Sequence, residues 1–109
     1  MLNYNPCRIA PSNQAFDNSR KPLLCGFLDL VTGKRYWIIN VHLSSMAGSA
    51  PQYGALQPPP PGREDVRTAQ VAQVSAFVQK IAAADPGALI AVLGDFNDFY
   101  FTPALQQLW

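Results

Sequence analysis

The pattern of apolar and polar positions along the chain predicts three strands. Residues 22–31 and 88–94 are mostly apolar, and residues 35–43 are rich in aromatic and β-branched side chains. Each stretch has the length and composition of a strand. The turn residues 32–34 join the first two strands into a hairpin.

A long helix is predicted between the second and third strands. Residues 63–84 combine helical spacing of apolar positions with many alanines, and the DPG sequence at 85–87 ends the helix. Its predicted inner face comprises Val66, Gln70, Val74, Phe77, Val78 and Ile81. A second helix is predicted to start at Thr102 as N-cap, with Pro103 in its first position.

The order strand, strand, helix, strand, helix predicts a mixed α/β sheet with helices on one face. A period of two sorts the side chains of the second strand. One face is wholly apolar and is expected to enter a core, with Trp37, Ile39, Val41 and Leu43. The opposite face becomes polar only at its carboxyl end, with Tyr36, Ile38, Asn40 and His42.

Two segments lack any such periodicity. Residues 44–62 are long for a connection inside a small domain, which is typical either of a functional loop or of a solvated surface loop. Residues 1–21 are polar and irregular. Cys7 and Cys25 are either buried thiols or a disulfide, which would require an oxidising compartment.

Composition narrows the class of protein. A length of 109 residues, about half of them apolar, suits one packed domain. The net charge of +1 gives no bulk attraction to nucleic acid or membrane, so any anion binding must come from a local site. No apolar run approaches the roughly 18 residues of a membrane span, and the N-terminus lacks the pattern of a signal peptide.

Polar side chains gather where two predicted strands end. Asn40 and His42 close one strand, and Asp95 and Asn97 follow another. Ligands of open α/β sheets gather beyond the carboxyl ends of strands, so we expect these side chains to converge within reach of one phosphate. The plainer alternatives are a structural histidine and an Asx-turn after the strand.

Arg67 and Gln70 lie one turn apart on the predicted helix. We expect them to tie the helix to the sheet by hydrogen bonds rather than to take part in chemistry.

Four motifs occur in a fixed order: SRKPL at 19–23, NVHLSS at 40–45, Arg67 with Gln70, and VLGDFND at 92–98. Together they resemble the endonuclease/exonuclease/phosphatase superfamily, which includes pancreatic deoxyribonuclease. The similarity is greatest to bacterial secreted nucleases of that superfamily. It extends over nearly the whole chain from about residue 9, through AFDNSRKPL, HLSSMAG, LQPPPPG and VLGDFNDF.

The resemblance implies a role for each polar residue. Asp95 would orient or deprotonate the attacking water, Asn97 would hold a phosphate oxygen or a metal-bound ligand, and His42 would contact the scissile phosphate. Arg20 and Asn40 would bind the substrate. Asp95 and Asn97 are the implied metal ligands, for Mg²⁺ or alternatively Mn²⁺ or Ca²⁺. Phosphodiester hydrolysis needs such a base and such donors.

The superfamily domain is a two-sheet α/β sandwich, so residues 1–109 resemble about half of it, a central part with α/β (α+β) character. Nothing here matches the main metal-binding glutamate or the Asp-His pair of its last strand. Val41 and Met46 also depart from the usual Asn and Lys of the secreted branch. The chain alone is therefore expected to be inactive.

The resemblance implies a metal-dependent phosphodiesterase, and a nuclease acting on DNA or RNA is the leading hypothesis. A lipid or sugar phosphodiesterase or phosphatase, and a non-catalytic binding module, are the alternatives. The implied location is extracellular or periplasmic, and the implied partner is nucleic acid rather than a membrane. A sheet face without its partner sheet would expose apolar residues, which predicts a homodimer.

Overall fold

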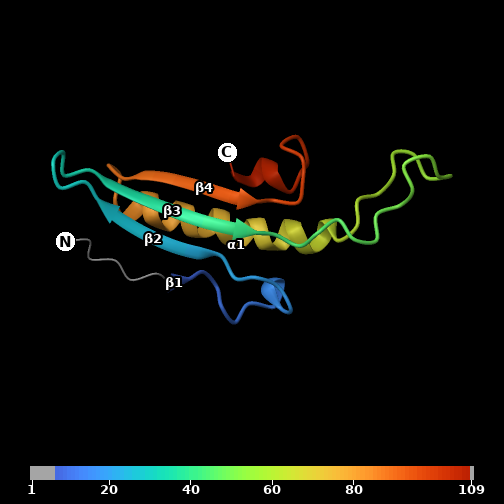
Figure 1. The fold of residues 1–109 in the computed structure, drawn as a ribbon, viewed down its shortest axis with the longest axis horizontal. Coiled ribbons are helices and arrows are strands. Elements are labelled where there is room, and N and C mark those ends of the chain that lie inside the picture. The colour runs from blue at the N-terminus through green and yellow to red at the C-terminus, as the bar shows by residue number, and fades with distance from the viewer. Residues whose placement is uncertain (1–6, 109) are drawn as a thin grey trace.

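A four-stranded sheet with one long helix against it forms the body of the molecule (Figure 1). The computed structural model describes residues 7–108. The strands lie side by side in chain order and are β1 Cys7–Arg8, β2 Leu23–Leu28, β3 Arg35–His42 and β4 Leu89–Asp95. The first three run antiparallel, whereas β3 and β4 are parallel. The prediction of a mixed sheet in an α+β fold is thus confirmed.

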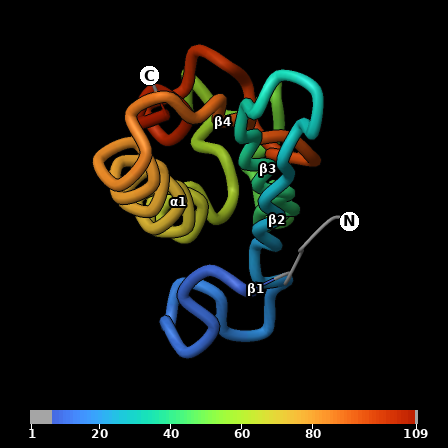
Figure 2. The backbone as a smooth tube through the Cα atoms, turned by 90° about the vertical axis from the view of Figure 1, so that its left-hand side faces the viewer, coloured from blue at the N-terminus to red at the C-terminus, as the bar shows by residue number. Residues whose placement is uncertain are grey.

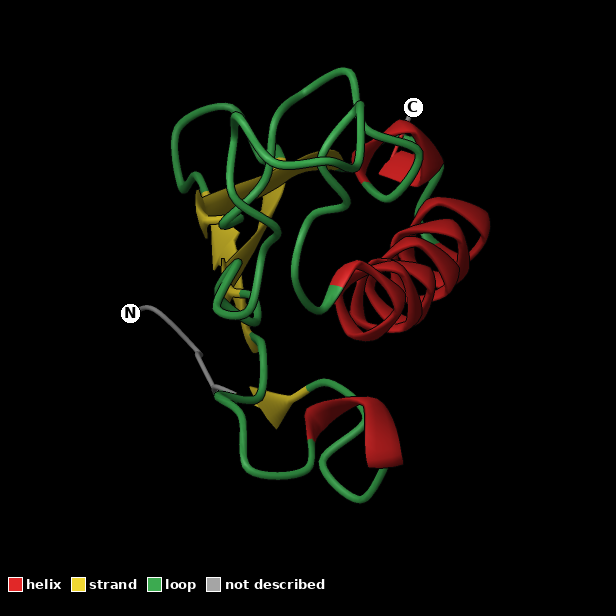
Figure 3. Ribbon diagram, turned by 90° about the vertical axis from the view of Figure 1, so that its right-hand side faces the viewer, coloured by secondary structure: helices red, strands yellow, loops and turns green. Residues whose placement is uncertain are grey.

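Helix α1, Glu64–Ala84, makes the crossover from β3 to β4 and covers one face of the sheet (Figures 2 and 3). Two short 3₁₀ helices flank this body, η1 Gln14–Phe16 and η2 Leu105–Leu108. The loop between β3 and α1 carries neither helix nor strand and projects beyond the end of the sheet (Figure 1). No helix in the described part of the chain is long and apolar enough to cross a membrane.

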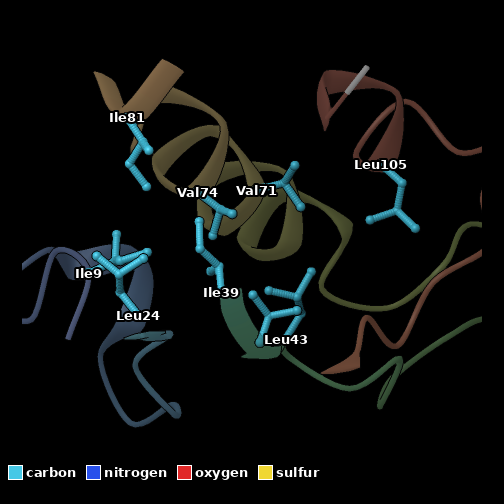
Figure 4. Close-up of a cluster of buried hydrophobic side chains, with 9 residues drawn as sticks. Ile9, Leu24, Ile39, Leu43, Val71, Val74, Ile81 and Leu105 are labelled. Atoms are coloured by element: carbon cyan, nitrogen blue, oxygen red, sulfur yellow. The ribbon is translucent and has the colours of Figure 1, made fainter. Parts of the chain in front are cut away.

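The core lies between α1 and the sheet, where side chains of several elements meet (Figure 4). On β3 the inward residues are those that the period of two selects, because Ile39 and Val41 are buried there and Leu43 follows directly after. Trp37 is half-buried and packs against the same cluster. The buried set is Ile9, Leu24, Ile39, Val41, Leu43, Val71, Val74, Ile81 and Leu105.

The predicted inner face of α1 was partly wrong. Its buried residues are Arg67, Gln70, Val71, Val74 and Ile81, whereas Val66 lies outside the core. Arg67 and Gln70 point inward because their side chains make buried hydrogen bonds, and the residues on the same side of the helix are buried with them. The face therefore includes Val71 in place of Val66.

The helix predicted from Thr102 is present only in part, because it begins at Leu105. The Thr102 hydroxyl donates to the carbonyl of Phe99 at 2.9 Å, and the Thr102 amide donates to the same carbonyl. These bonds fold residues 99–102 into a turn, so only the four residues of η2 that follow are helical.

Strand β2 is shorter than the strand predicted over residues 22–31, because the Asp29 side chain ends it. Asp29 accepts hydrogen bonds from the Thr32 hydroxyl and from the Val31 amide, which closes the hairpin turn directly after Leu28. The bond from Thr32, followed by that from Val31, holds the pKa of the Asp29 carboxyl below its ordinary value.

The sheet face opposite α1 is not covered by any described helix (Figure 2). On β3, Tyr36 and Ile38 are half-exposed, and on β4, Leu89 and Leu93 are about half exposed, at 50% and 45%. The homodimer that such a face implies stays a prediction. Cys7 and Cys25 are free thiols, but Cys7 is exposed and Cys25 is half-buried, so the expectation of two buried thiols was wrong.

Candidate functional site

The parallel pairing of β3 and β4 places the carboxyl ends of both strands at the same edge of the sheet. His42 is directly opposite Asp95, and their Nε2 and Oδ2 atoms are 3.7 Å apart. The two side chains are 40% and 59% exposed. That separation is just outside hydrogen-bond range, so both groups are available to a ligand.

The two asparagines differ in what they can reach. Asn40 is exposed on the open face of the sheet, two residues before His42. Asn97 has a positive φ of 49°. Its backbone N–H donates to Asp95 Oδ1 at 2.9 Å, which closes an Asx-turn. Its side-chain Nδ2 donates to the Leu43 carbonyl at 3.0 Å. Asn97 therefore fixes the Asp95 carboxylate and anchors the chain directly after β3.

A cleft lies beside the His42–Asp95 pair. It consists of two adjoining hollows of about 370 and 300 Å³, and Arg20 and His42 line both. The first hollow also has Asn18, Ser19, Ser44 and Arg63 in its wall. The second has Arg8, Lys21, Asn40 and Asp95. Residues far apart in the sequence thus meet at the polar end of the sheet.

The charge of this cleft is positive although the chain as a whole is nearly neutral. Arg8, Arg20, Lys21 and Arg63 surround it, and among residues 7–108 Asp95 is the one carboxylate in its wall. Guanidinium groups match the geometry of phosphate oxygens. The site is therefore suited to an anion. It supplies locally the positive charge that the chain as a whole, with a net charge of +1, does not provide.

Sequence reasoning found Arg20, Asn40, His42 and Asp95 but missed the other cations. Lys21 stands inside the SRKPL motif, and this was the available signal for it. Arg8 reaches the cleft only because β1 pairs it with Leu23. A two-residue strand inside an irregular segment has no periodicity to find.

Gln70 holds the segment that carries Arg20 in position. Its side chain is fully buried and accepts a hydrogen bond from the Ser44 amide at 2.9 Å. Its Nε2 donates to the Ala15 carbonyl at 2.8 Å and to the Ser19 hydroxyl at 3.2 Å. Gln70 thus joins the chain beside Arg20 to the segment directly after β3. The predicted hydrogen bonds from the helix are present, but they reach the segments beside the sheet and not its strands.

Arg67 makes the second tie, and Asp98 is its partner. Arg67 Nε lies 2.8 Å from Asp98 Oδ2, and neither side chain has any exposed surface. Arg67 Nη1 also donates to the Gly62 carbonyl at 2.6 Å and to the Ser45 carbonyl at 3.3 Å. The Arg67 guanidinium therefore holds both ends of the long loop, through Ser45 and Gly62, and the segment after β4, through Asp98. A buried arginine needs such a carboxylate, but no pattern in the sequence connects Arg67 with Asp98.

Gly94 lets β4 approach β3 directly before Asp95. Its φ is +127°, and a Cβ atom there would lie 2.0 Å from the Val41 carbonyl oxygen and 2.8 Å from Asn40 Oδ1. No other residue fits this backbone. The glycine is thus part of what brings Asp95 opposite His42.

The described residues do not fit a divalent metal site by themselves. No group of three or more His, Cys, Asp or Glu side chains that could hold a metal occurs within residues 7–108. Of the two implied ligands, Asp95 supplies the one carboxylate of the cleft, beside cationic neighbours. Ca²⁺ takes roughly six to eight oxygen ligands and Mg²⁺ about six in octahedral geometry. Asp95 would therefore need further oxygen ligands, beyond those of residues 7–108, to hold either ion.

Neither a protein-family model nor a curated protein matches the chain. The fold class follows from the structure, and the superfamily resemblance stays a prediction from the four sequence motifs.

Proposed function

We propose that this chain carries the phosphate-binding side of a phosphodiesterase site of the endonuclease/exonuclease/phosphatase type, with a nucleic acid strand as substrate. The observation that carries the proposal is the cationic cleft in which Arg20 and His42 lie beside Asp95 at paired strand ends. Donors held in a fixed position stabilise the charge that grows on phosphate oxygens during hydrolysis.

Each side chain has a chemical role in this proposal. Arg20 and His42 donate hydrogen bonds to phosphate oxygens. Arg8 and Lys21, which already donate to the carbonyls of Lys21 and Phe16, add positive charge to the cleft. Asp95 is the proton acceptor for the attacking water, since it is the one carboxylate in the wall of the cleft. The Asx-turn with Asn97 fixes the direction of that carboxylate.

Binding of a short oligonucleotide tests the cationic cleft. Arg20→Ala should weaken binding of a fluorescently labelled single strand and reduce the slope of log K against log salt by about 1, because one phosphate contact is lost. Lys34→Ala is the matched control, since it removes one positive charge at the opposite end of the sheet, in the hairpin turn after β2 (Figure 1). Anisotropy titrations at several salt concentrations measure both. Equal effects of the two substitutions would contradict a local phosphate site.

The 109-residue chain by itself should not hydrolyse DNA or RNA measurably in Mg²⁺, Mn²⁺ or Ca²⁺. In the superfamily a metal ion would activate the water and neutralise charge. Asp95 by itself provides too few oxygen ligands to hold such an ion. Denaturing gels of a labelled strand measure cleavage. Strong metal-dependent cleavage by this chain would overturn the assignment of ligands. In a longer chain that adds carboxylates, Asp95→Ala should abolish turnover and leave the fold intact.

A non-catalytic nucleic-acid-binding module is the second candidate. The excess of cationic groups over a single carboxylate favours it, because such a cleft binds phosphate without chemistry. Turnover separates the two candidates: a longer chain that binds oligonucleotides through Arg20 yet never cleaves them would be a binding module.

A further inference from the structure

We propose that Phe99, Tyr100 and Phe101, which we call the aromatic turn, form a stacking platform for an unpaired nucleobase of the strand whose phosphates occupy the cleft. The inference rests on the proposed function and deepens it, because it selects a single-stranded nucleic acid over a duplex as the ligand.

The aromatic turn exposes three rings in succession. Phe99, Tyr100 and Phe101 are 56%, 77% and 60% exposed. The Phe99 and Phe101 rings are stacked, with centroids 5.3 Å apart and planes within 2° of parallel. Tyr100 meets Phe101 edge-on, at 5.4 Å and 84°. A contiguous patch of exposed apolar side chains is typical of a surface that binds a partner or ligand.

The backbone under these rings is firmly held. Asp98, directly before the turn, is fully buried in the ion pair with Arg67. The Phe99 carbonyl accepts hydrogen bonds from both the amide and the hydroxyl of Thr102. Gln106 Nε2 donates to the Phe101 carbonyl at 3.3 Å. A platform fixed in this way loses little conformational freedom when a ligand binds, which favours affinity.

The aromatic turn also lies near the cleft. It follows β4 at the same end of the sheet where β3 ends (Figure 1). Phe99 is four positions after Asp95, so their Cα atoms are at most about 14 Å apart. A strand whose phosphate contacts Arg20 and His42 therefore brings a neighbouring base within reach of the rings.

Cationic groups beside exposed aromatic rings are the combination that binds single-stranded nucleic acids. The cations track the phosphates, and each unpaired base offers a π-face to a ring. In a duplex those faces are already stacked on neighbouring bases. The arrangement therefore favours an unpaired strand. Because DNA and RNA bases both have such π-faces, stacking by itself does not select one sugar over the other.

The test compares oligonucleotides with and without bases. A labelled ten-nucleotide single strand, an abasic strand with the same phosphates, and the corresponding duplex are titrated against the chain, with DNA and RNA versions to show which sugar is preferred. We expect the abasic strand and the duplex to bind more weakly than the single strand. Phe99→Leu with Phe101→Leu, which keeps apolar area but removes the π-faces, should weaken single-strand binding by about 5- to 150-fold.

Matched controls separate stacking from other effects. The double substitution should leave the salt slope unchanged, whereas Arg20→Ala lowers it. Tyr53→Ala removes a ring that is 94% exposed in the long loop and should have no effect. In the unaltered chain, the Phe99 and Phe101 ring resonances should shift upon addition of the single strand, an observation that needs no variant to fold.

The outcomes distinguish the two proposals. Arg20-dependent binding that is indifferent to bases and to the leucine variant overturns the platform and leaves the proposed function standing. No binding of any oligonucleotide by the unaltered chain overturns both. Sedimentation that shows dimers dissociating in the leucine variant would make the aromatic turn a protein interface and overturn the platform.

Discussion

Arg67→Ala should lower the free energy of unfolding by about 3–5 kcal/mol, a large share of the 5–15 kcal/mol typical of a domain. The substitution leaves the fully buried Asp98 carboxylate without its partner at 2.8 Å. It also removes the donor that the Gly62 and Ser45 carbonyls share. Urea unfolding followed by circular dichroism measures the change.

The exposed ion pair at the other end of the molecule provides the control. Arg35 and Asp85 are 2.9 Å apart, nearly the same distance, but their side chains are 62% and 21% exposed. Arg35→Ala should therefore change stability by about 0–1 kcal/mol. Similar losses from Arg67→Ala and Arg35→Ala would mean that burial of the Arg67–Asp98 pair has no energetic consequence.

Gly94→Ala is expected to have the second large effect, a loss of about 3 kcal/mol or more. The φ of +127° is unfavourable for alanine, and the new methyl group would lie 2.0 Å from a backbone oxygen of β3. Relief of that contact must separate β3 from β4 beside the His42–Asp95 pair. Oligonucleotide binding should therefore fall together with stability.

Gly87→Ala is the matched control for Gly94→Ala. A Cβ atom at Gly87 would meet nothing within 4 Å, and its φ is not positive. We expect a stability change of no more than about 1 kcal/mol, because alanine restricts the unfolded chain without a clash. A Gly94→Ala protein as stable as Gly87→Ala would refute the close approach of the two strands.

The sequence predicted the sheet well because its signal there is local. The alternation along β3 separates Ile39 and Val41 from Asn40 and His42, and the structure has the same separation. The parity of His42 and Asp95 at two strand ends likewise predicted their meeting, since parallel strands bring their carboxyl ends to one edge.

The features that the sequence did not predict depend on contacts between distant segments. Asp98 is paired with a residue 31 positions away, and no spacing rule connects them. Arg8 enters the cleft through a strand of two residues. The turn at Thr102 arises because its hydroxyl bonds back to Phe99, although the sequence Thr-Pro equally favours the start of a helix.

The long loop between β3 and α1 has a consequence for how the site is divided along the chain. It extends the molecule to 57 Å in its longest dimension, and Tyr53 within it is 94% exposed, so this is where a protease would cut first. One piece would keep β1 to β3 with His42, and the other would keep α1 and β4 with Asp95. The β3–β4 ladder and the helix–sheet core would hold the pieces together, so nicked chains would retain the cleft. Two separately made halves could likewise restore it by complementation.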